Sequence, residues 1–361
     1  MNARENKIPR RKTRQVKVGK IFIGGDAPIS IQSMTKLPTE EVDLVLRQIE
    51  RLVAEGCEIV RLAVPDRKAA KALQEIRKGT DAPLVADIHL NYRLALEAID
   101  NGVDKVRVNP GYLREKEQVQ AVIRKAKAAG IPIRVGANSG SILRAGEMGR
   151  ARLSGMAQAM VDRVADYLTL FEEEDFGDIV ISLKASDVVE TVRAYELMAE
   201  RCDYPFHVGI TACGPPSTGI VASSMGIGHL LLEGIGDTVR VSLTGDPVDE
   251  VRIAKRILQG LGLRGFGPMI ISCPTCGRCH GDLVSIVQEV EEKLSTVSLP
   301  IKVAVMGCEV NGPGEAAEAD IGVALGRGHA VLFRTGMVVR KVRLQEVADA
   351  LLLEATSLPE E

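Results

Sequence analysis

The sequence predicts an α/β protein, a (β/α)8 TIM barrel followed by a smaller α+β domain, and three observations lead to this fold class. Between residues 29 and 262, eight short runs rich in Val and Ile alternate with amphipathic stretches. These runs are apolar throughout and do not alternate with polar residues, as is typical of parallel strands covered on both faces. Eight such units in about 230 residues match a closed barrel, whereas an open doubly wound sheet, the alternative, usually has fewer strands.

The elements of the barrel follow in chain order. We expect a helix over residues 40–56, because apolar residues recur there at helical spacing from Val42 to Val53. Gly56, Gly102 and Gly130 each follow a helical stretch, and we expect them to end helices in the left-handed conformation. The eight expected strands are residues 29–34, 58–64, 83–88, 104–109, 132–137, 178–183, 205–211 and 237–243.

The chain on either side of these units has a different pattern. Residues 1–28 are expected to form an N-terminal tail and a hairpin, residues 16–28, that covers the barrel floor. After a Gly-rich connection, residues 268–361 are expected to form the second domain, with the barrel spanning 29–262. Its predicted elements are a helix over 281–295, strands at 301–306, 319–325, 330–334 and 337–342, and a last helix from about residue 344.

The composition excludes several classes of protein. The chain of 361 residues is 45% hydrophobic and 26% charged with a formal net charge of −2, so we expect a folded protein that binds neither nucleic acid nor membrane. No apolar run is long enough for a membrane helix, and the basic N-terminus lacks the apolar segment of a secretory signal. Seven cysteines without such a signal predict a cytoplasmic protein with thiol or metal chemistry.

Polar residues gather at the carboxyl ends of the expected strands, where enzymes with this barrel carry their chemistry. Five of the eight ends carry a cation, and Asp87 is the only obvious carboxylate partner among them. A single such cation is as readily explained by a structural ion pair, but five at one opening favour a compact polyanion such as a diphosphate. We also expect backbone N–H groups of residues 217–219 and 234–238 to lie near its phosphates. The candidate substrate-binding residues are Arg61, Asp87, His89, Arg107, Asn109, Arg134, Asn138, Lys184, Arg240 and Ser242.

Three cysteines at C-x2-C-x2-C spacing, Cys273, Cys276 and Cys279, open the second domain, and Cys308 follows downstream. A zinc site completed by His280 is one interpretation, but a zinc ribbon would need a second close pair. An iron–sulfur cluster is preferred. Its fourth ligand is either Cys279 or Glu315, and only a carboxylate, a weak ligand for iron, would leave a position that substrate can take.

Long motifs in this chain resemble the 4-hydroxy-3-methylbut-2-enyl diphosphate synthase family, the iron–sulfur enzymes of the methylerythritol phosphate route to isoprenoids. They include "VADIHLNYRLALEAIDNGVDKVRVNPG" (85–111), "IPIRVGANSGS" (131–141), "EGIGDTVRVSLT" (233–244), "CPTCGR" (273–278) and "GCEVNGPGEA" (307–316). The resemblance covers nearly the whole chain.

The resemblance implies a TIM barrel joined to a [4Fe–4S] domain with cluster ligands Cys273, Cys276, Cys308 and Glu315. It implies an oxidoreductase that opens and dehydrates 2-C-methyl-D-erythritol 2,4-cyclodiphosphate with two electrons from ferredoxin or flavodoxin. It also implies a homodimer in which the cluster domain of one subunit caps the barrel of the other. Positions matching the family's substrate site are Arg61, Asp87, Arg107, Arg134, Asn138, Lys184, Arg240 and Ser242.

The chain departs from the family pattern at several positions. Ala212 stands where the family has a substrate-facing Glu, Lys36 and Leu37 replace Asn-Thr, and Cys279 is unusual. Lineage drift is one explanation. The alternatives are a paralogous iron–sulfur reductase acting on another small phosphorylated substrate, or a non-catalytic electron-relay protein with an all-cysteine cluster.

Overall fold

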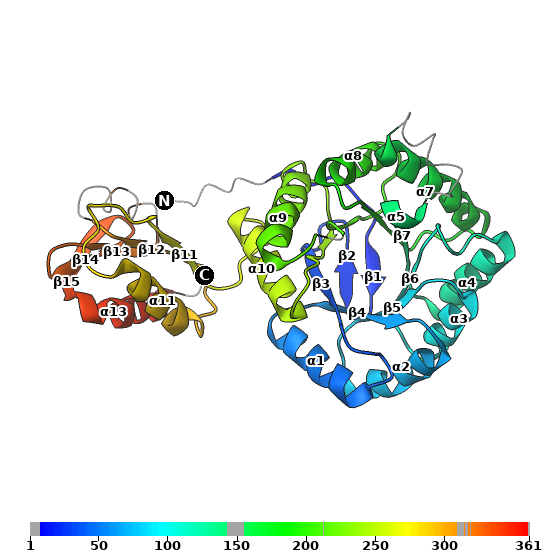
Figure 1. Ribbon diagram of the computed structural model, residues 1–361, viewed down its shortest axis with the longest axis horizontal. Helices are drawn as coiled ribbons and strands as arrows, with labels where there is room; N and C mark the ends of the chain where they lie inside the picture. The colour runs from blue at the N-terminus through cyan, green and yellow to red at the C-terminus, as the bar shows by residue number, and fades with distance from the viewer. Residues whose placement is uncertain are drawn as a thin grey trace. The chain divides into compact units, whose positions relative to one another are not determined.

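A computed structural model describes residues 8–142, 155–211, 213–308, 314, 317 and 319–359 of the chain. It divides into two compact units, one ending at Arg264 and the other beginning at Gly265. Each unit has its own sheet, and both are drawn in Figure 1.

The first unit is a barrel of eight parallel strands, as predicted (Figure 1). The strand order is β8-β7-β6-β5-β4-β3-β10-β9, and a parallel bridge between Ile181 and Phe206 joins the two ends of the sheet. The side chains of the strands are almost all buried, because the barrel interior lies on one face and the helices lie on the other. The strands are β3 (Ser30–Met34), β4 (Ile59–Val64), β5 (Leu84–Ile88), β6 (Lys105–Val108), β7 (Ile133–Asn138), β8 (Ile179–Lys184), β9 (His207–Val208) and β10 (Thr238–Val239).

Helices follow the strands and surround them (Figure 1). The predicted apolar face of the first helix is confirmed, since Val45, Ile49 and Leu52 are buried in α1. The three predicted helix-ending glycines all have positive φ, which Gly adopts without strain. The helices are α1 (Val42–Ala54), α2 (Arg67–Gly79), α3 (Tyr92–Asp100), α4 (Lys116–Ala129), α5 (Ser139–Ile142), α7 (Met156–Glu173), α8 (Val188–Ala199), α9 (Pro216–Leu232) and α10 (Pro247–Gly260).

A hairpin closes the amino-terminal end of the barrel. Strands β1 (Val16–Val18) and β2 (Ile21–Ile23) pair antiparallel, and their buried side chains pack against Ile59, Val85 and Val180 of the barrel strands. This end of the barrel is therefore filled with apolar side chains, and only the carboxyl end is left for polar chemistry.

The last two barrel strands are shorter than predicted. The sequence predicts strands over 205–211 and 237–243, but regular pairing is limited to two residues in β9 and two in β10. Beyond these residues, single hydrogen bonds hold the chain, such as those from Arg240 N–H to Val208 O and from Thr211 N–H to Ala185 O. The chain leaves the ladder here to form the polar opening of the barrel.

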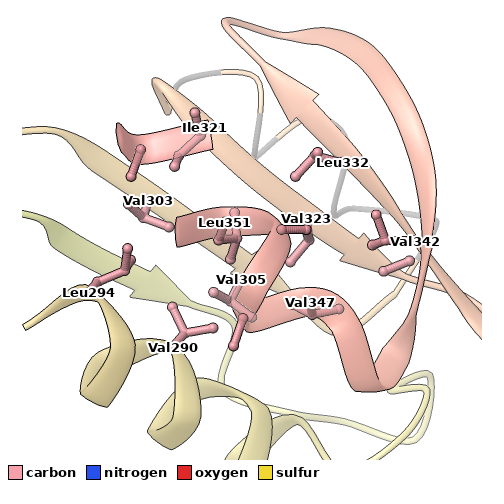
Figure 2. Packing of buried hydrophobic residues seen from close by; sticks show 14 of the residues in the cluster. Val290, Leu294, Val303, Val305, Ile321, Val323, Leu332, Val342, Val347 and Leu351 are labelled. Carbon is pink, nitrogen blue, oxygen red and sulfur yellow. The ribbon is translucent and has the colours of Figure 1, made fainter. Parts of the chain in front are cut away.

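The second unit is a five-stranded mixed sheet in the order β11-β12-β13-β14-β15. Strands β11, β12 and β13 are parallel, while β14 and β15 complete the sheet antiparallel. Helices α11 (Leu283–Leu294) and α13 (Val347–Thr356) cover one face, and Val290, Leu294, Val303 and Leu351 belong to the core between them (Figure 2). The strands are β11 (Met269–Ser272), β12 (Lys302–Met306), β13 (Ile321–Leu325), β14 (His329–Arg334) and β15 (Met337–Arg343), followed by the 3-10 turn Leu344–Glu346.

Strand β11 was not predicted, because four residues beside a Gly-rich segment give too short an apolar run to recognise. It carries the chain directly into the cysteine motif. Among the helices that the structure describes, none is long and apolar enough to cross a lipid bilayer.

Candidate active site

The carboxyl end of the barrel brings four of the predicted residues into one group. Asp87 on β5 pairs in register with Arg107 on β6, and Arg107 pairs with Arg134 on β7. Residues in register on neighbouring parallel strands point to the same side of the sheet, here the barrel interior. Arg61 on β4 joins them through Asp87.

Asp87 is the carboxylate at the centre of this group. Its Oδ1 lies 3.1 Å from Nη1 of Arg107, and its Oδ2 lies 3.7 Å from both Nε of Arg61 and Nε2 of His89. Burial alone would raise the pKa of Asp87, but the positive charges of Arg61 and Arg107, with smaller contributions from His89 and Arg134, hold this pKa well below its usual range. Asp87 therefore stays ionised at any physiological pH.

Arg134 and Lys184 are buried cations without a carboxylate partner in the described part of the chain. Arg134 is 1% exposed, and its Nε and Nη1 have no hydrogen-bond partner among the described residues. Lys184 is 6% exposed. Burial, with repulsion from the neighbouring arginines, lowers the pKa of both groups. Buried donors without acceptors are costly, and an anion at this position would satisfy them.

Two glycines leave space beside these cations. A Cβ on Gly136 of β7 would lie 2.5 Å from Nε of Arg107, and a Cβ on Gly209 would lie 2.8 Å from Nζ of Lys184. Any side chain at these positions would displace the cations, so the glycines keep room for the charged groups at the opening.

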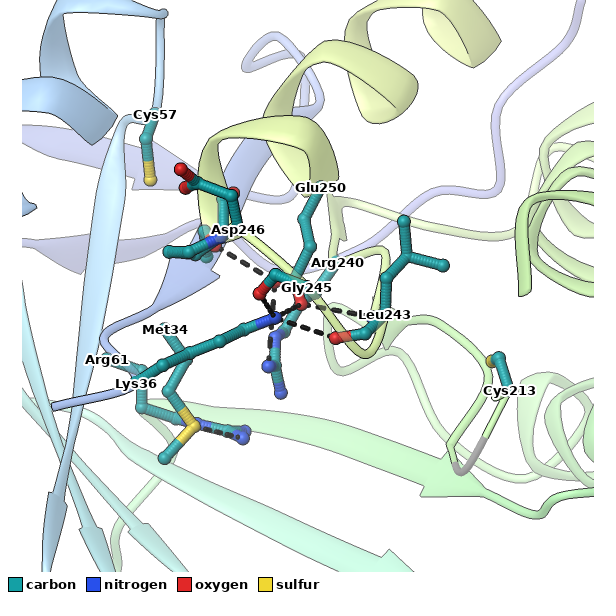
Figure 3. A network of polar contacts seen from close by, with 12 residues as sticks. Met34, Lys36, Cys57, Arg61, Cys213, Arg240, Leu243, Gly245, Asp246 and Glu250 are labelled. Carbon is teal, nitrogen blue, oxygen red and sulfur yellow. Dashed lines mark hydrogen bonds and ion pairs between the residues drawn. The ribbon is translucent and has the colours of Figure 1, made fainter. Parts of the chain in front are cut away.

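A second carboxylate near the cations, Glu250 on α10, was missed by the sequence analysis, which considered only the strand ends and found Asp87 as the one obvious partner there. Glu250 is 1% exposed and accepts hydrogen bonds from Ser33 Oγ and Leu243 N–H, both at 3.0 Å. Its Oε2 lies 3.7 Å from Nη2 of Arg240, and its Oε1 lies 3.0 Å from Nζ of Lys36 (Figure 3).

Lys36 joins two loops at this opening. Its Nζ also donates to the carbonyl oxygens of Leu243 and Gly245, at 2.6 Å each, and so ties the end of β3 to the loop before α10 (Figure 3). With Lys36 added to the five predicted cations and Glu250 added to Asp87, the positive charges at the opening still outnumber these carboxylates by four.

The other predicted residues are placed as follows. His89 is 43% exposed above Asp87. Asn109 stabilises its own loop, because its Oδ1 accepts from Gly111 N–H at 2.8 Å and its Nδ2 donates to Ser141 Oγ at 2.9 Å. Asn138, at the end of β7, and Ser242, after β10, are half-buried. Substrate-binding roles for all of these residues remain predictions.

The expectation that residues 234–238 lie near phosphate is wrong. They precede β10 or begin it, and so lie at the amino-terminal end of the barrel. Asp237 there accepts hydrogen bonds from Arg10 and Thr13 of the N-terminal segment and from Phe206 N–H. Residues 234–238 therefore anchor the N-terminal chain instead of binding phosphate.

Two buried polar residues one layer deeper were also missed. Lys105 lies two residues before Arg107 on β6, and His207 lies on β9. Both are completely buried, and neither Nζ of Lys105 nor the ring nitrogens of His207 have hydrogen-bond partners among the described residues. Burial, with the surrounding cations, lowers the pKa of His207, which keeps the ring neutral. The alternation along β6 would have revealed Lys105, because it shares the inward face with Arg107.

Replacing Asp87 by asparagine should destabilise the barrel by about 3–5 kcal/mol, because the change leaves Arg61 and Arg107 buried without a compensating charge. Chemical unfolding at neutral pH measures this effect. The matched control is Asp249→Asn, which removes a carboxylate that is 53% exposed on α10 and should change stability little. Since the pKa of Asp87 is depressed, its contribution to the unfolding free energy is present above the ordinary Asp pKa and disappears as pH falls through the depressed value. The two variants should therefore differ least in strong acid.

The second unit gathers the four predicted cysteines. Cys273 and Cys276 follow β11, and Cys308 follows β12, which is the neighbouring parallel strand. Backbone N–H of Gly307 donates to Sγ of Cys273 at 3.3 Å. A Cβ on Gly307 would lie 2.6 Å from Sγ of Cys279 and 3.2 Å from Sγ of Cys273, so these two sulfur atoms lie against the backbone of Gly307, where a side chain would not fit.

The surroundings of these cysteines favour the thiolate of Cys276 but not that of Cys279. The backbone N–H and guanidinium of Arg278 lower the pKa of Cys276, while burial and the charges of the other three cysteines raise the pKa of Cys279. In the described part of the chain, no three His, Cys, Asp or Glu side chains lie close enough together to hold one metal ion. Cysteine thiolates are the usual ligands of iron–sulfur groups, so the residue types gathered here fit such a group. Glu315, the predicted fourth ligand, and Ala212 lie outside the described residues.

Comparison with known proteins adds to this geometry. Residues 13–255 match the family model described as the GcpE TIM-barrel domain, and residues 269–357 match the GcpE protein C-terminal domain. A protein of Geobacillus thermodenitrificans named 4-hydroxy-3-methylbut-2-en-1-yl diphosphate synthase (flavodoxin) is 49% identical over 356 residues, covering 98% of this chain and 94% of that protein. A protein of Thermodesulfovibrio yellowstonii with the same name is 51% identical over 347 residues, covering 96% and 99%.

Proposed function

The chain belongs to the GcpE family, and from this premise we propose that it is an oxidoreductase that converts 2-C-methyl-D-erythritol 2,4-cyclodiphosphate to 4-hydroxy-3-methylbut-2-enyl diphosphate. The observation that carries the proposal is the excess of buried positive charge at the barrel opening, which suits a cyclic diphosphate. The two alternative interpretations, a paralogue with another substrate and a pure electron relay, are not favoured, because the related proteins that cover almost the whole chain are named as the synthase.

The barrel residues bind and orient the substrate. Arg134 and Lys184, which have no carboxylate partner in the described chain, bind phosphate oxygens, and the guanidinium of Arg134 can do so with two parallel hydrogen bonds. Asp87 orients Arg61 and Arg107 toward the same opening. Glu250 orients Arg240 and, through Lys36, holds the loop before α10 in place. Asn138 and Ser242 lie at the same end of the strands and complete the site with neutral donors.

The second unit holds a [4Fe–4S] cluster through Cys273, Cys276, Cys308 and Glu315. The position of Cys273, Cys276 and Cys308 after the neighbouring parallel strands β11 and β12 supports this assignment, and the carboxylate completes the set. When bound, such a cluster supplies electrons one at a time and an iron that acts as a Lewis acid. Flavodoxin, which the related proteins carry in their names, is the proposed electron donor, and ferredoxin is the alternative. The cytoplasm, a reducing compartment, suits these thiols.

A homodimer is the proposed assembly, in which the cluster unit of one subunit serves the barrel of the other. Helix α9 supports an interface on the barrel, because it leaves several apolar side chains on the surface, namely Ile220, Val221, Met225 and Leu232. Isolated apolar residues are ordinary on a surface, but four on one helix favour a protein contact. Light scattering on the purified protein should give twice the chain mass, and Val221→Glu/Met225→Glu should give a monomer.

An anaerobic assay with the cyclodiphosphate and reduced flavodoxin tests the activity. We expect the allylic diphosphate as product, identified by mass spectrometry. Ala212→Glu should be assayed in parallel, because it restores the family residue. If both proteins hold their full iron and sulfide and neither makes the product, the proposed substrate is wrong.

A further inference from the structure

The third cysteine of the motif, Cys279, has no role in the proposed ligand set, yet its sulfur lies against Gly307 beside that of Cys273. Its sulfur is the atom nearest to the place where a Cβ on Gly307 would be, and Sγ of Cys273 is the next. Backbone N–H of Cys279 donates to the carbonyl oxygen of Cys276 at 2.9 Å, and N–H of the next residue, His280, donates to Gly307 O at 2.8 Å. The turn that presents Cys276 therefore also fixes Cys279 beside the residue that precedes Cys308.

The spacing of these cysteines also indicates that Cys279 can act as a cluster ligand. In bacterial ferredoxins, the three cysteines of a C-x2-C-x2-C run bind one [4Fe–4S] cluster, and a distant cysteine supplies its fourth ligand. Cys273, Cys276 and Cys279 have this spacing, and Cys308 is the distant cysteine. This unit thus offers four cysteine sulfurs, one more than the proposed cluster uses.

We propose that Cys279 is a reserve ligand of the cluster, whose thiolate binds the iron held by Glu315 when the carboxylate is absent from that iron. The inference depends on the proposed function, since that function assigns Glu315 to the fourth iron. In the exchange an iron–oxygen bond breaks, an iron–sulfur bond forms and the thiol proton goes to solvent, so no electrons are transferred. A soft thiolate suits iron in a sulfide cluster better than a carboxylate does, so the exchange retains the fourth iron but closes its open position.

The test compares clusters assembled anaerobically in Glu315→Ala and in Glu315→Ala/Cys279→Ser. If Cys279 is a reserve ligand, Glu315→Ala keeps the iron content of the wild type, and its oxidised form shows no three-iron signal in electron paramagnetic resonance. The double variant should lose about one iron in four and show that signal. The matched control Glu315→Ala/Cys202→Ser makes the same thiol change in the barrel unit and should behave as Glu315→Ala does.

Alkylation provides a second measurement that does not depend on activity. Iodoacetamide should label Cys279 in the cluster-loaded wild type but not in cluster-loaded Glu315→Ala, as read by peptide mass spectrometry. Equal loss of iron in Glu315→Ala and the double variant, with Cys279 labelled in Glu315→Ala as it is in the wild type, would mean that Cys279 only packs against the nearby core and would overturn the proposal. Wild-type protein that holds four irons but makes no product contradicts the proposed function instead and does not affect this comparison.

Discussion

Replacing Lys184 by methionine should make the substrate-free protein more stable and almost inactive. Lys184 is 6% exposed at the end of β8, its nearest charged neighbours are arginines, and no ion pair to a carboxylate is found for it in the described chain. Methionine has a similar length and volume, so it fills the same space without the cost of a buried charge. We expect a gain of about 1–3 kcal/mol in unfolding free energy, or about 2–4 °C in melting temperature for each kcal/mol.

Turnover should fall by about 10²- to 10³-fold, the typical effect of removing one charged donor from a preorganised site. Inorganic pyrophosphate should raise the melting temperature of the wild type more than that of the variant, because the variant has lost one phosphate ligand. The control Lys68→Met, at an exposed position on α2, should change neither quantity. A variant that keeps wild-type turnover, or that loses stability, would contradict the assignment of Lys184 to the phosphates.

The pH dependence of this stability gain has a definite sign. The pKa of Lys184 is lowered in the folded protein, so the unfolded chain binds the proton more readily and folding is penalised below the ordinary lysine pKa. The advantage of Lys184→Met should therefore be largest at low pH and should shrink as pH rises toward about 10. Thermal melts of both proteins across this range measure the difference.

The barrel was predictable because each of its elements carries a local signal. The apolar runs of the central strands, the helical spacing from Val42 to Val53 and the glycines at helix ends depend on neighbouring residues only. The shortness of β9 and β10 was not predictable, because the apolar runs continue past the residues where regular pairing with the neighbouring strands gives way to single hydrogen bonds.

The part of the site that stands at the carboxyl ends of the barrel strands was predictable from the sequence. The group formed by Arg61, Asp87, Arg107 and Arg134 follows from parallel register, which places the ends of neighbouring strands side by side. Glu250 was missed because it comes from a helix. Its signal is present all the same, since Glu250 falls on the buried stripe of α10 with Pro247, Val251 and Ala254, where an acidic residue is unusual.

Replacing Gly307 by alanine should remove the cluster without unfolding the protein. The φ of Gly307 is not in the positive region where alanine would be strained, so the backbone tolerates the change. The new methyl group, however, would lie 2.6 Å from Sγ of Cys279 and 3.2 Å from Sγ of Cys273. Sγ of Cys279 must rotate away, and Sγ of Cys273, a proposed ligand, must shift by a few tenths of an ångström. A thiolate ligand out of position weakens the binding of the whole cluster.

Iron and sulfide analysis after anaerobic reconstitution should give a small fraction of the wild-type content, and turnover should fall in proportion, while the circular dichroism of the apoprotein should be unchanged. The matched control is Gly277→Ala in the same cysteine loop, where a Cβ would meet nothing within 4 Å in the described structure. Gly277→Ala should assemble a full cluster. Both variants add one methyl group next to a cysteine of this set, but only the methyl group at residue 307 would press against the sulfurs. A difference in iron content would therefore locate the cluster at the sulfurs beside Gly307, and equal iron contents would place it elsewhere.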